Sequence, residues 1–469
     1  MKPRLAIAAL ISLLLLLAAC SGGPSPLDNA PPPDATASPT EAVLLTPVQA
    51  ATETQVPTAT MAPTNTPAPT ETAAPTSTLL PPPTETTSLE TTPSATLTPE
   101  PSPTPEPTLL PAPLYLLSGE EGQQQIWRLE RDGETLTQVT DEPEGVRGFD
   151  VSPVDGALVY ITGDELVRAD GWGGDRVVLY VVPLQEEPPP DIPVELTNPR
   201  WSPDGSQIAF GLLGLNLLNA ATGEERRVLT NATWAELLET GRAGPHEFYT
   251  PEMWSPDGSQ ILVWVAYFQE GGRYALVNLA DNSITDFGTP TGGDCCHFAW
   301  GRDGFLYVAN DGTLYWRGGL WRVDPATGGT ATLLQMQEGN MGTLDATAQV
   351  THPRLSEDGY LYAWKWALGE SLPELQIGES PQQPGMALQR VPLEQAGDNA
   401  AWEMVHSELI FAPFEAHWGQ EGEGAVIWAH NPPNFSLAGG ELRWIPASDE
   451  PSVLLPIEGH ELRWGHEQR

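Results

Sequence analysis

Residues 201–210 read WSPDGSQIAF, and the first eight letters return unchanged in WSPDGSQILV at residues 254–263. In both copies a tryptophan precedes the Ser-Pro-Asp-Gly tetrapeptide, and an apolar run follows it. Proline presets the φ angle of a turn, aspartate accepts hydrogen bonds from nearby backbone, and glycine takes the position of positive φ. Each copy therefore predicts a first strand that ends at the tryptophan, a tight turn and a second strand.

Weaker copies of this turn recur along the chain with a mean spacing of about 52 residues, a period typical of β-propellers with four-stranded blades. They read VSPVDG from residue 151, WGRDG from 300, LSEDG from 355, WGQEGEG from 418 and WGHEQ from 464. The repetition favours an architectural repeat over a duplicated active-site loop.

The segments between the turns contain short runs rich in aromatic and β-branched residues, which predict strands. We expect second strands at 157–162, 207–213, 260–268, 305–310, 360–366 and 425–430. Third strands are expected at 176–184, 273–280 and 318–325, and fourth strands are expected to end in Leu-Thr pairs at 194–197 and 227–230. No long helical pattern interrupts them, so the fold class is all-β.

The two ends of this region complement each other. Residues 114–140 supply a second, third and fourth strand without a first, and residues 459–469 supply a first strand with nothing after it. Pairing the N- and C-terminal strands closes a ring and leaves no open edge. With six internal units, this composite unit gives seven blades over 114–469, about 51 residues each. Six or eight blades are the alternatives.

The two intact copies resemble the repeat of TolB-like, WD40-like β-propellers, and the resemblance covers essentially all of 114–469. It implies a ring that usually serves as a platform for protein partners. In other relatives the ring gates a serine peptidase. The sequence contains no GxSxG nucleophile motif and has no room for a hydrolase domain, which excludes that activity.

Residues 1–20 are predicted to be a bacterial lipoprotein signal peptide. Lys2 and Arg4 precede a nearly unbroken apolar run at 5–19, which is shorter than the ~20 residues of a spanning helix. The sequence LAAC at 17–20 resembles a lipobox, which implies that Cys20 is acylated and becomes the new N-terminus. The alternative is an ordinary secretory signal. The lipobox predicts an anchor on the extracytoplasmic face of the cell membrane.

Residues 21–113 are predicted to be a disordered linker rich in Pro, Thr and Ser. They contain 23 prolines, no aromatic residue and no Lys or Arg. Such a segment buries too little apolar surface to offset its chain entropy. Proline favours extended polyproline II conformations, so we expect a stalk that lifts the propeller from the membrane.

The chain has a formal net charge of −41, of which residues 1–20 carry +2 and residues 21–113 carry −9, leaving −34 on 114–469. This balance argues against nucleic acid or anionic lipid as a partner, because both need clustered Lys and Arg. We expect an acidic, solvated, monomeric domain, with cation binding as the alternative.

The first residue of each turn copy, such as Trp201 or Leu355, is called its anchor residue. Histidines and carboxylates lie just ahead of these anchor residues, where the innermost strands of a propeller approach the mouth of its central channel. Converging groups of this kind bind divalent metals. Seven-bladed oligogalacturonate lyases hold a metal with histidines, and THPRLSEDG at 351–359 resembles their His-Pro-x-x-Ser strand start. Such enzymes need basic residues to neutralise a polyuronate, whereas this domain is acidic, so plain polar lining is the alternative. The candidates are Asn198, Glu252, His297, His352, Glu415, His417, His460 and Glu461.

Cys295 and Cys296 are the only cysteines besides Cys20, and His297 follows them. The pair is interpreted as two small buried residues of an inner strand. A vicinal disulfide in an oxidising compartment and a soft-metal site with His297 are the alternatives.

The sequence thus predicts a lipoprotein whose propeller binds a protein or glycan partner. No catalytic residues and no cofactor are assigned, apart from a candidate divalent metal. The first alternative is a metal-dependent carbohydrate-active lyase or hydrolase with its site at the channel mouth. The second is an envelope sensor or structural protein.

Overall fold

The computed structural model describes residues 108–183, 194–231, 247–267, 271–287, 296–310, 318–335, 348–368, 385–411, 413–419, 421–429 and 440–466. The chain divides into two units, Met1–Leu97 and Thr98–Arg469, and all described residues belong to the second. The predicted leader with Cys20, the predicted linker up to residue 107, and Cys295 lie outside the described residues. No helix among the described residues has the length and apolar character to cross a membrane.

Five sheets each contain four antiparallel strands that are consecutive in the chain. The first is formed by β4 (Gly148–Val151), β5 (Leu158–Thr162), β6 (Glu165–Ala169) and β7 (Val177–Val181), and the second by β8 (Thr197–Trp201), β9 (Gln207–Gly211), β10 (Gly214–Asn219) and β11 (Glu225–Thr230). The third contains β12 (Glu247–Trp254), β13 (Gln260–Tyr267), β14 (Gly272–Asn278) and β15 (Ile284–Asp286).

The next two sheets follow the same order. The fourth contains β16 (His297–Trp300), β17 (Leu306–Asn310), β18 (Gly319–Val323) and β19 (Thr330–Gln335). The fifth contains β20 (Val350–Leu355), β21 (Tyr360–Trp366), β22 (Met386–Pro392) and β23 (Glu403–Met404), with two short 3-10 helices, η2 (Leu393–Gln395) and η3 (Asn399–Ala401), before its last strand.

The remaining sheet has seven strands and joins the two ends of the described region. Its order is β24 (Pro413–Trp418), β25 (Gly424–Ala429), β26 (Gly440–Pro446), β27 (Val453–Trp464), β1 (Leu114–Ser118), β2 (Gln125–Leu129) and β3 (Leu136–Gln138). The long strand β27 pairs with β26 through its first part, where Gly459 lies opposite Gly440. Its last part pairs with β1, where Trp464 lies opposite Leu114.

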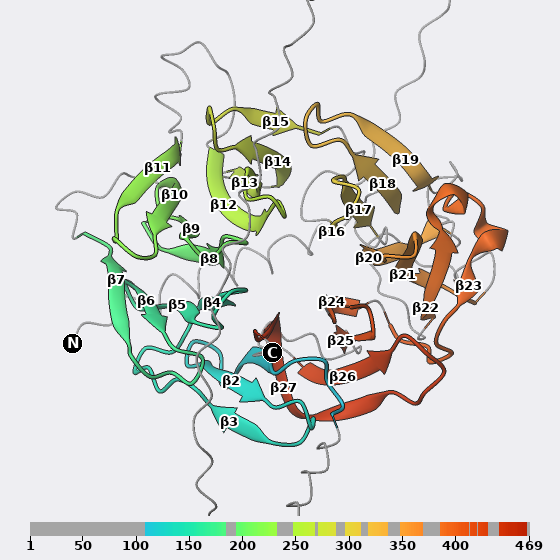
Figure 1. Cartoon of the computed structure of the whole chain (residues 1–469), viewed down its shortest axis with the longest axis horizontal. Coiled ribbons are helices and arrows are strands. Elements are labelled where there is room, and N and C mark those ends of the chain that lie inside the picture. The colour runs from blue at the N-terminus through green and yellow to red at the C-terminus, as the bar shows by residue number, and fades with distance from the viewer. Residues whose placement is uncertain are drawn as a thin grey trace, which may run out of the picture. The chain divides into compact units, whose positions relative to one another are not determined.

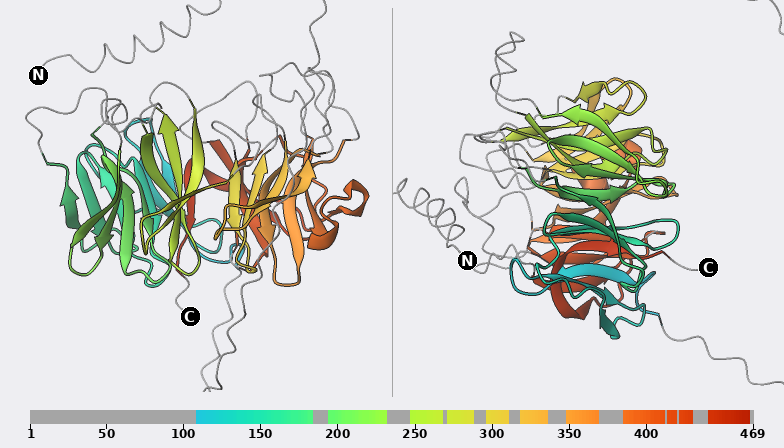
Figure 2. Two further views of the ribbon diagram at one scale, coloured as in Figure 1. Left: turned by 90° about the horizontal axis from the view of Figure 1, so that it is seen from above. Right: turned by 90° about the vertical axis from the view of Figure 1, so that its left-hand side faces the viewer.

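The sheets are the blades of a β-propeller, with the first strand of each blade towards the middle of the ring (Figure 1). The predicted ends of these strands are confirmed, because β4, β8, β12, β16, β20, β24 and β27 end at residues 151, 201, 254, 300, 355, 418 and 464. β4 contacts both β8 and β27, and β20 contacts both β16 and β24. Figure 2 shows the strands side-on, running between the two faces of the ring.

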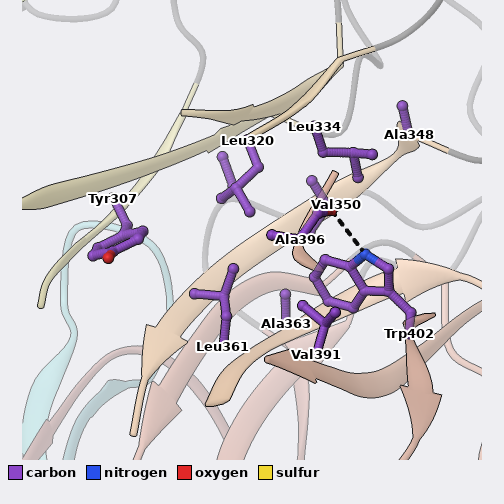
Figure 3. Close-up of a cluster of buried hydrophobic side chains, with 11 residues drawn as sticks. Tyr307, Leu320, Leu334, Ala348, Val350, Leu361, Ala363, Val391, Ala396 and Trp402 are labelled. Carbon is purple, nitrogen blue, oxygen red and sulfur yellow. Dashed lines mark hydrogen bonds between the residues drawn. The ribbon is translucent and has the colours of Figure 1, made fainter. Parts of the chain in front are cut away.

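Hydrophobic clusters join neighbouring blades. In the cluster of Figure 3, Tyr307 and Leu320 of one blade pack against Leu361 and Val391 of the next, and all four are fully buried. The indole Nε1 of Trp402 closes this cluster by donating to the carbonyl oxygen of Ala396 at 3.1 Å. Each such leucine contributes about 1.5–3 kcal/mol by leaving water. The propeller is therefore held by side chains between its sheets.

Two of the tryptophans that begin the turn copies, Trp254 and Trp464, also join blades through hydrogen bonds. Nε1 of Trp254 donates to the carbonyl oxygen of Arg200 at 3.1 Å, and Nε1 of Trp464 donates to that of Trp418 at 2.6 Å. Both indoles therefore lie between neighbouring blades. Trp172, by contrast, is 59% exposed, and the guanidinium Cζ of Arg128 lies 3.8 Å from the centre of its ring system.

The Ser-Pro-Asp-Gly turns satisfy their own polar groups. Ser202 Oγ donates to Asp204 Oδ1 at 2.6 Å and accepts from the backbone N–H of Gln207 at 2.9 Å, and Gly205 has φ +68°. Ser255 and Asp257 repeat this geometry, with the same distances of 2.6 and 2.9 Å. The identical octapeptide is a structural turn, because its polar side chains hold its own backbone.

The order of strands in the first blade differs from the prediction. Residues 176–184 were expected to be a third strand, but β7 at Val177–Val181 is the fourth. The third strand is β6, in which Glu165 and Arg168 interrupt the apolar pattern. A two-residue turn joins β5 to β6. The Leu-Thr pair at 196–197 leads into β8 and does not end a fourth strand.

Candidate functional site

Three inner strands carry a residue with positive φ three positions before their anchor residue. These residues are Asn198 at +41°, His352 at +49° and Glu461 at +52°. In each case the pairing with the next strand shifts its register at this point, as in a β-bulge. Such a backbone costs about 1–3 kcal/mol for a residue with a Cβ, and bulges are common beside functional sites. The three side chains therefore lie at corresponding irregularities of the central strands.

An arginine joins three of the inner strands. Nε of Arg463 on β27 contacts Oδ1 of Asp150 on β4 at 3.1 Å, and Arg463 also donates to the carbonyl oxygen of Leu462 at 2.7 Å. Oδ2 of Asp150 accepts from the backbone N–H of Trp201 on β8 at 2.7 Å. The ion pair is largely shielded, with 17% and 14% of the two side chains exposed. It therefore fixes β27, β4 and β8 relative to one another.

Glu415 on β24 extends this network. Its two carboxylate oxygens accept from the backbone N–H groups of Glu461 at 2.9 Å and Leu462 at 2.7 Å. Burial raises the pKa of Glu415 to about 7, although the charge of Arg463 and the backbone donors oppose this rise. One oxygen of Glu461, Oε2, is buried without a hydrogen-bond partner among the described residues. This side of the ring is therefore rich in carboxylates of limited solvation.

Arg200 forms the corresponding link to β12. Its Nε donates to the carbonyl oxygen of Glu252 at 2.9 Å, and Nδ2 of Asn198 donates to Oε1 of the Glu252 side chain at 3.3 Å. Burial raises the pKa of Glu252, while the charges of Arg200 and Arg463 lower it. Asn198, Arg200 and Glu252 thus join β8 to β12.

The two predicted histidines of this half do not converge with the carboxylates into a ligand set. Burial lowers the pKa of His417 to about 3, and the positive charges of Arg463 and Arg200 lower it further. Nε2 of His460 lies 3.0 Å from Nε2 of Gln124, so the amide donates to the ring. Burial lowers the pKa of His460, against the opposing charge of Glu461. Both imidazoles are therefore neutral near pH 7.

The opposite half of the ring brings His297 and His352 together. Their ring centres lie 3.6 Å apart with the planes inclined by 31°. Oγ1 of Thr351 lies 2.9 Å from Nδ1 of His352, and burial lowers the pKa of His352 well below its usual value, with His297 adding to the effect. The two rings are therefore stacked against each other at a tilt.

The predicted metal ligands are thus divided between a carboxylate and arginine network and a stacked histidine pair. No group of three or more His, Cys, Asp or Glu side chains in the described part of the chain is arranged to hold a metal ion. Metal binding therefore stays a prediction. Cys296 is disulfide-bonded and has φ +108°. Its pairing with Cys295 also stays a prediction, since Cys295 lies outside the described residues.

Sequence reasoning missed Asp150, Arg200 and Arg463, which organise the network. All three stand one position before an anchor residue, and NPRW at 198–201 and ELRW at 461–464 share an Arg-Trp pair. That repeated pair is the pattern that could have found the arginines. Asp150 precedes Val151 and belongs to no such repeated residue pair.

The chain matches no protein-family model, and no curated protein sequence matches it. Similar solved structures include TolB from Acinetobacter baumannii, with 13% identity, a TM-score of 0.36 and coverage of 76% of this chain and 82% of the other. Oligogalacturonate lyase from Vibrio parahaemolyticus has 12% identity and a TM-score of 0.44, over 68% and 83% of the two chains. The C-terminal WD40 domain of Sif2 has 12% identity and a TM-score of 0.41, over 72% and 79%. At these values the propeller fold rests on the strand pairings of the chain itself.

Proposed function

We propose that the chain is a lipid-anchored protein of a bacterial cell envelope whose propeller is a binding platform for a protein or glycan partner. The leader that ends at Cys20 supports the anchor, and the proline-rich residues 21–113 support a spacer between lipid and propeller. A lipidated cysteine with two or three acyl chains holds a protein more firmly than a single chain does. The platform acts on the extracytoplasmic face as a monomer and does not bind nucleic acid.

We further infer that the ring has seven blades and closes through β27. The two parts of this strand support the inference, because one completes the blade of β24–β26 and the other completes the blade of β1–β3. Seven hydrophobic clusters among the described residues agree with that count. Six lie between different sheets, and the seventh lies between the β24–β26 part and the β1–β3 part of the seven-stranded sheet.

The observation that carries the binding role is the bonding among the inner strands. Asp150, Arg463 and Glu415 are hydrogen-bonded to residues of other inner strands, and Arg200 bonds to the backbone of β12. Charged groups engaged in this way stabilise the ring and are poorly placed to act on a substrate. A partner then meets the turns and faces of the blades.

A metal-dependent lyase or hydrolase acting on carbohydrate is the second candidate. The feature in its favour is THPRLSEDG at 351–359, which resembles the His-Pro-x-x-Ser strand start of oligogalacturonate lyases. An envelope sensor or structural protein is the third candidate. It would bind a partner as the platform does, so only the identity of the bound partner distinguishes these two candidates.

The test uses the full chain, expressed with its leader and extracted from membranes with detergent. We expect acyl groups on Cys20 by mass spectrometry, and a Cys20→Ala variant without them that is lost from the membrane fraction. Affinity capture from an envelope extract at about 0.15 M salt should retain a protein or glycan partner. Capture of no partner contradicts the platform. Stoichiometric metal that is lost on His352→Ala supports the second candidate.

A further inference from the structure

The fourth strand of the first blade has an open edge. β7 is the last strand of its sheet and lies at the outer side of the ring (Figure 1). It pairs with β6 on one side, and in the described part of the chain no strand pairs with its other side. An edge of this kind presents backbone N–H and C=O groups to which another chain can add a strand.

The exposed side chains of β7 are apolar. Val177 is 54% exposed, Val178 is 36% exposed and Val181 is 55% exposed. They account for three of the nine exposed large hydrophobic side chains among the described residues, so exposed apolar surface is concentrated on this strand. Valine is β-branched and packs well on the pleated surface of a strand. The edge is therefore suited to a further strand with apolar side chains.

The fourth strands of the other blades are better protected. β3, β15 and β23 have three residues or fewer, and β11 exposes Glu225, Arg226 and Arg227. Short length and charge both hinder pairing with a foreign strand, whereas β7 has five residues and the uncharged sequence VVLYV. A bulge interrupts the pairing of β7 with β6, but β11 and β19 contain bulges too, so this irregularity does not distinguish β7.

Packing between blades fixes the position of β7. The ring centre of Tyr180 lies 5.5 Å from that of Phe210 on β9. Leu179 and Val182 pack against the same hydrophobic cluster, which joins the first and second blades. Just after the strand, the N–H of Val182 donates to the carbonyl oxygen of Asp164 at 2.9 Å. A strand that is already positioned in this way lowers the ordering cost of adding a partner.

Acidic side chains stand at both ends of β7. Asp175 is exposed two residues before the strand, and Asp164, whose backbone Val182 contacts, is also exposed. Neither carboxylate forms an ion pair with another described residue, whereas the three arginines of this blade are each paired with a carboxylate. Residues 141–183 contain nine acidic and three basic residues, a net charge of −6. The surroundings of the edge therefore attract a cationic partner.

Charge and composition disfavour the occupants that this chain itself could supply. A second copy would bring its own net charge of −34 on 114–469 against an equal charge. The predicted linker, residues 21–113, contains 23 prolines and no Lys or Arg. Proline has no N–H to donate to a strand ladder. The partner that fits is thus a different protein.

We propose that the open edge of β7 binds an extended segment of a protein partner, with apolar residues at its centre and Lys or Arg at its ends. This rests on the proposed platform function and names the class of partner and the surface that it meets. The segment adds a strand to the first blade, and its backbone pairs with that of β7. Its apolar side chains cover Val177, Val178 and Val181. Its basic ends lie near Asp164 and Asp175.

The test uses the full chain and a short synthetic peptide in which Val and Thr alternate between Lys residues at both ends. Calorimetry measures binding, and hydrogen exchange reports on the backbone of β7. We expect binding that slows amide exchange within Val177–Val181, because strand pairing covers N–H groups. A peptide interrupted by proline should not bind. A peptide with Glu in place of Lys should bind at least about threefold more weakly at low salt.

One pair of variants tests the apolar contact. Val177→Thr combined with Val181→Thr keeps the β-branched shape but removes apolar surface, so it should weaken binding of the Lys-ended peptide at least about fivefold. Val154→Thr is the control, because Val154 is 51% exposed but lies in the β4–β5 turn. We expect its binding to be unchanged. Circular dichroism checks that each variant keeps the fold.

A second pair of variants tests the charge. Asp164→Asn combined with Asp175→Asn should weaken binding of the Lys-ended peptide at least about threefold at low salt, and the difference should shrink as salt is added. Asn tolerates the positive φ of Asp175, +51°, so the backbone is kept. Asp449→Asn, an exposed residue between β26 and β27, is the control and should leave binding unchanged.

Four results would overturn the proposal. They are no binding of the Lys-ended peptide, equal binding of the Glu-ended peptide, equal weakening by Val154→Thr, and a dimer in sedimentation that the paired valine variant abolishes. Affinity capture from the envelope extract separates this proposal from the platform. A partner still captured by the paired valine variant supports the platform and overturns its placement at β7. Capture of none by the unaltered protein contradicts the platform, while peptide binding still decides the role of the edge.

Discussion

The turn at residues 202–206 and the turn at residues 356–360 occupy the same place in their blades, but their side chains do different things. In the first, Asp204 accepts from the hydroxyl of Ser202 and from both the N–H and the hydroxyl of Ser206. In the second, Asp358 accepts from Ser356 Oγ and, at 3.4 Å, from the N–H of Tyr360, and one side opens onto a pocket. In the intact turn the polar side chains hold the backbone, whereas in this divergent turn they also line this pocket.

The largest effect is expected on removing the tryptophan of an intact copy. Trp254 is 7% exposed and donates across the blade interface to Arg200. Trp254→Ala leaves a cavity there and should lower the free energy of unfolding by about 3–5 kcal/mol, measured by urea denaturation. Trp172→Ala is the control, and we expect a loss of less than about 1 kcal/mol because Trp172 is exposed. Equal losses would show that the anchor tryptophans do not join the blades.

A smaller effect is expected within the turns themselves. Ser202 is 3% exposed, and Ser202→Ala leaves the N–H of Gln207 without its acceptor, which should cost about 1–3 kcal/mol of unfolding free energy. Ser356 is half-buried, and water replaces its bonds, so Ser356→Ala should cost about 0.5–1.5 kcal/mol. The same denaturation experiment measures both variants. A greater loss of unfolding free energy in Ser356→Ala than in Ser202→Ala would contradict the proposed difference between intact and divergent turns.

Restoring the repeat should stabilise the divergent turn. Pro203 and Pro256 stand in the intact copies where Glu357 stands in the divergent one. Glu357→Pro should therefore raise the free energy of unfolding by about 0.4–1 kcal/mol, by reducing the freedom of the unfolded chain. Calorimetric unfolding measures the gain, with Glu357→Ala as the control for the lost ion pair with Arg302. Destabilisation by proline alone would mean that the backbone at 357 is not that of the intact turns.

The last comparison concerns pH, where turns and inner strands differ in the sign of their effect on stability. Hydrogen bonds lower the pKa of Asp204, so its contribution to stability is lost as the pH falls. Burial raises the pKa of Glu415 to about 7, whereas an unfolded glutamate has about 4.3. Between these values the folded state binds the extra proton, so the contribution of Glu415 falls as the pH rises.

Substitution of Glu415 isolates its contribution to the pH dependence of the unfolding free energy. The lowered pKa of His417, about 3 against about 6.5 unfolded, makes stability rise with pH over part of the same window. Glu415→Gln removes the opposing term, so its unfolding free energy should rise more steeply between pH 5 and 7 than that of the unaltered protein. Urea denaturation at pH 5, 6 and 7 measures the slopes. Equal slopes would show that Glu415 is solvated.

The fold was predictable where its determinants are local. The Trp-Ser-Pro-Asp-Gly sequence specifies a strand end and a turn within a few residues, and all seven first strands end at the predicted positions. The third strand of the first blade was missed because β6 is short and carries Glu165 and Arg168. Its pairing with β5 and β7 stabilises it more than its own pattern indicates.

The candidate site was less predictable because its contacts join distant parts of the chain. Arg463 and Asp150 are 313 positions apart, and no local pattern encodes that ion pair. The sequence placed histidines and carboxylates at the inner strands correctly, but their grouping depends on bulges at Asn198, His352 and Glu461. Charge pairing between blades decides which of these side chains meet.

The position of β1 determines how the fold carries mechanical load. The chain ahead of Thr108 enters the propeller through β1, which is hydrogen-bonded to β2 on one side and to β27 on the other. Before β1 is reached, Leu109 and Leu110 donate their backbone N–H groups to the carbonyl oxygen of Arg131, and release of β1 itself requires the hydrogen bonds on both of its sides to break. Force applied at the N-terminal side of the propeller is therefore carried by the sheet in which β1 pairs with β2 and with β27.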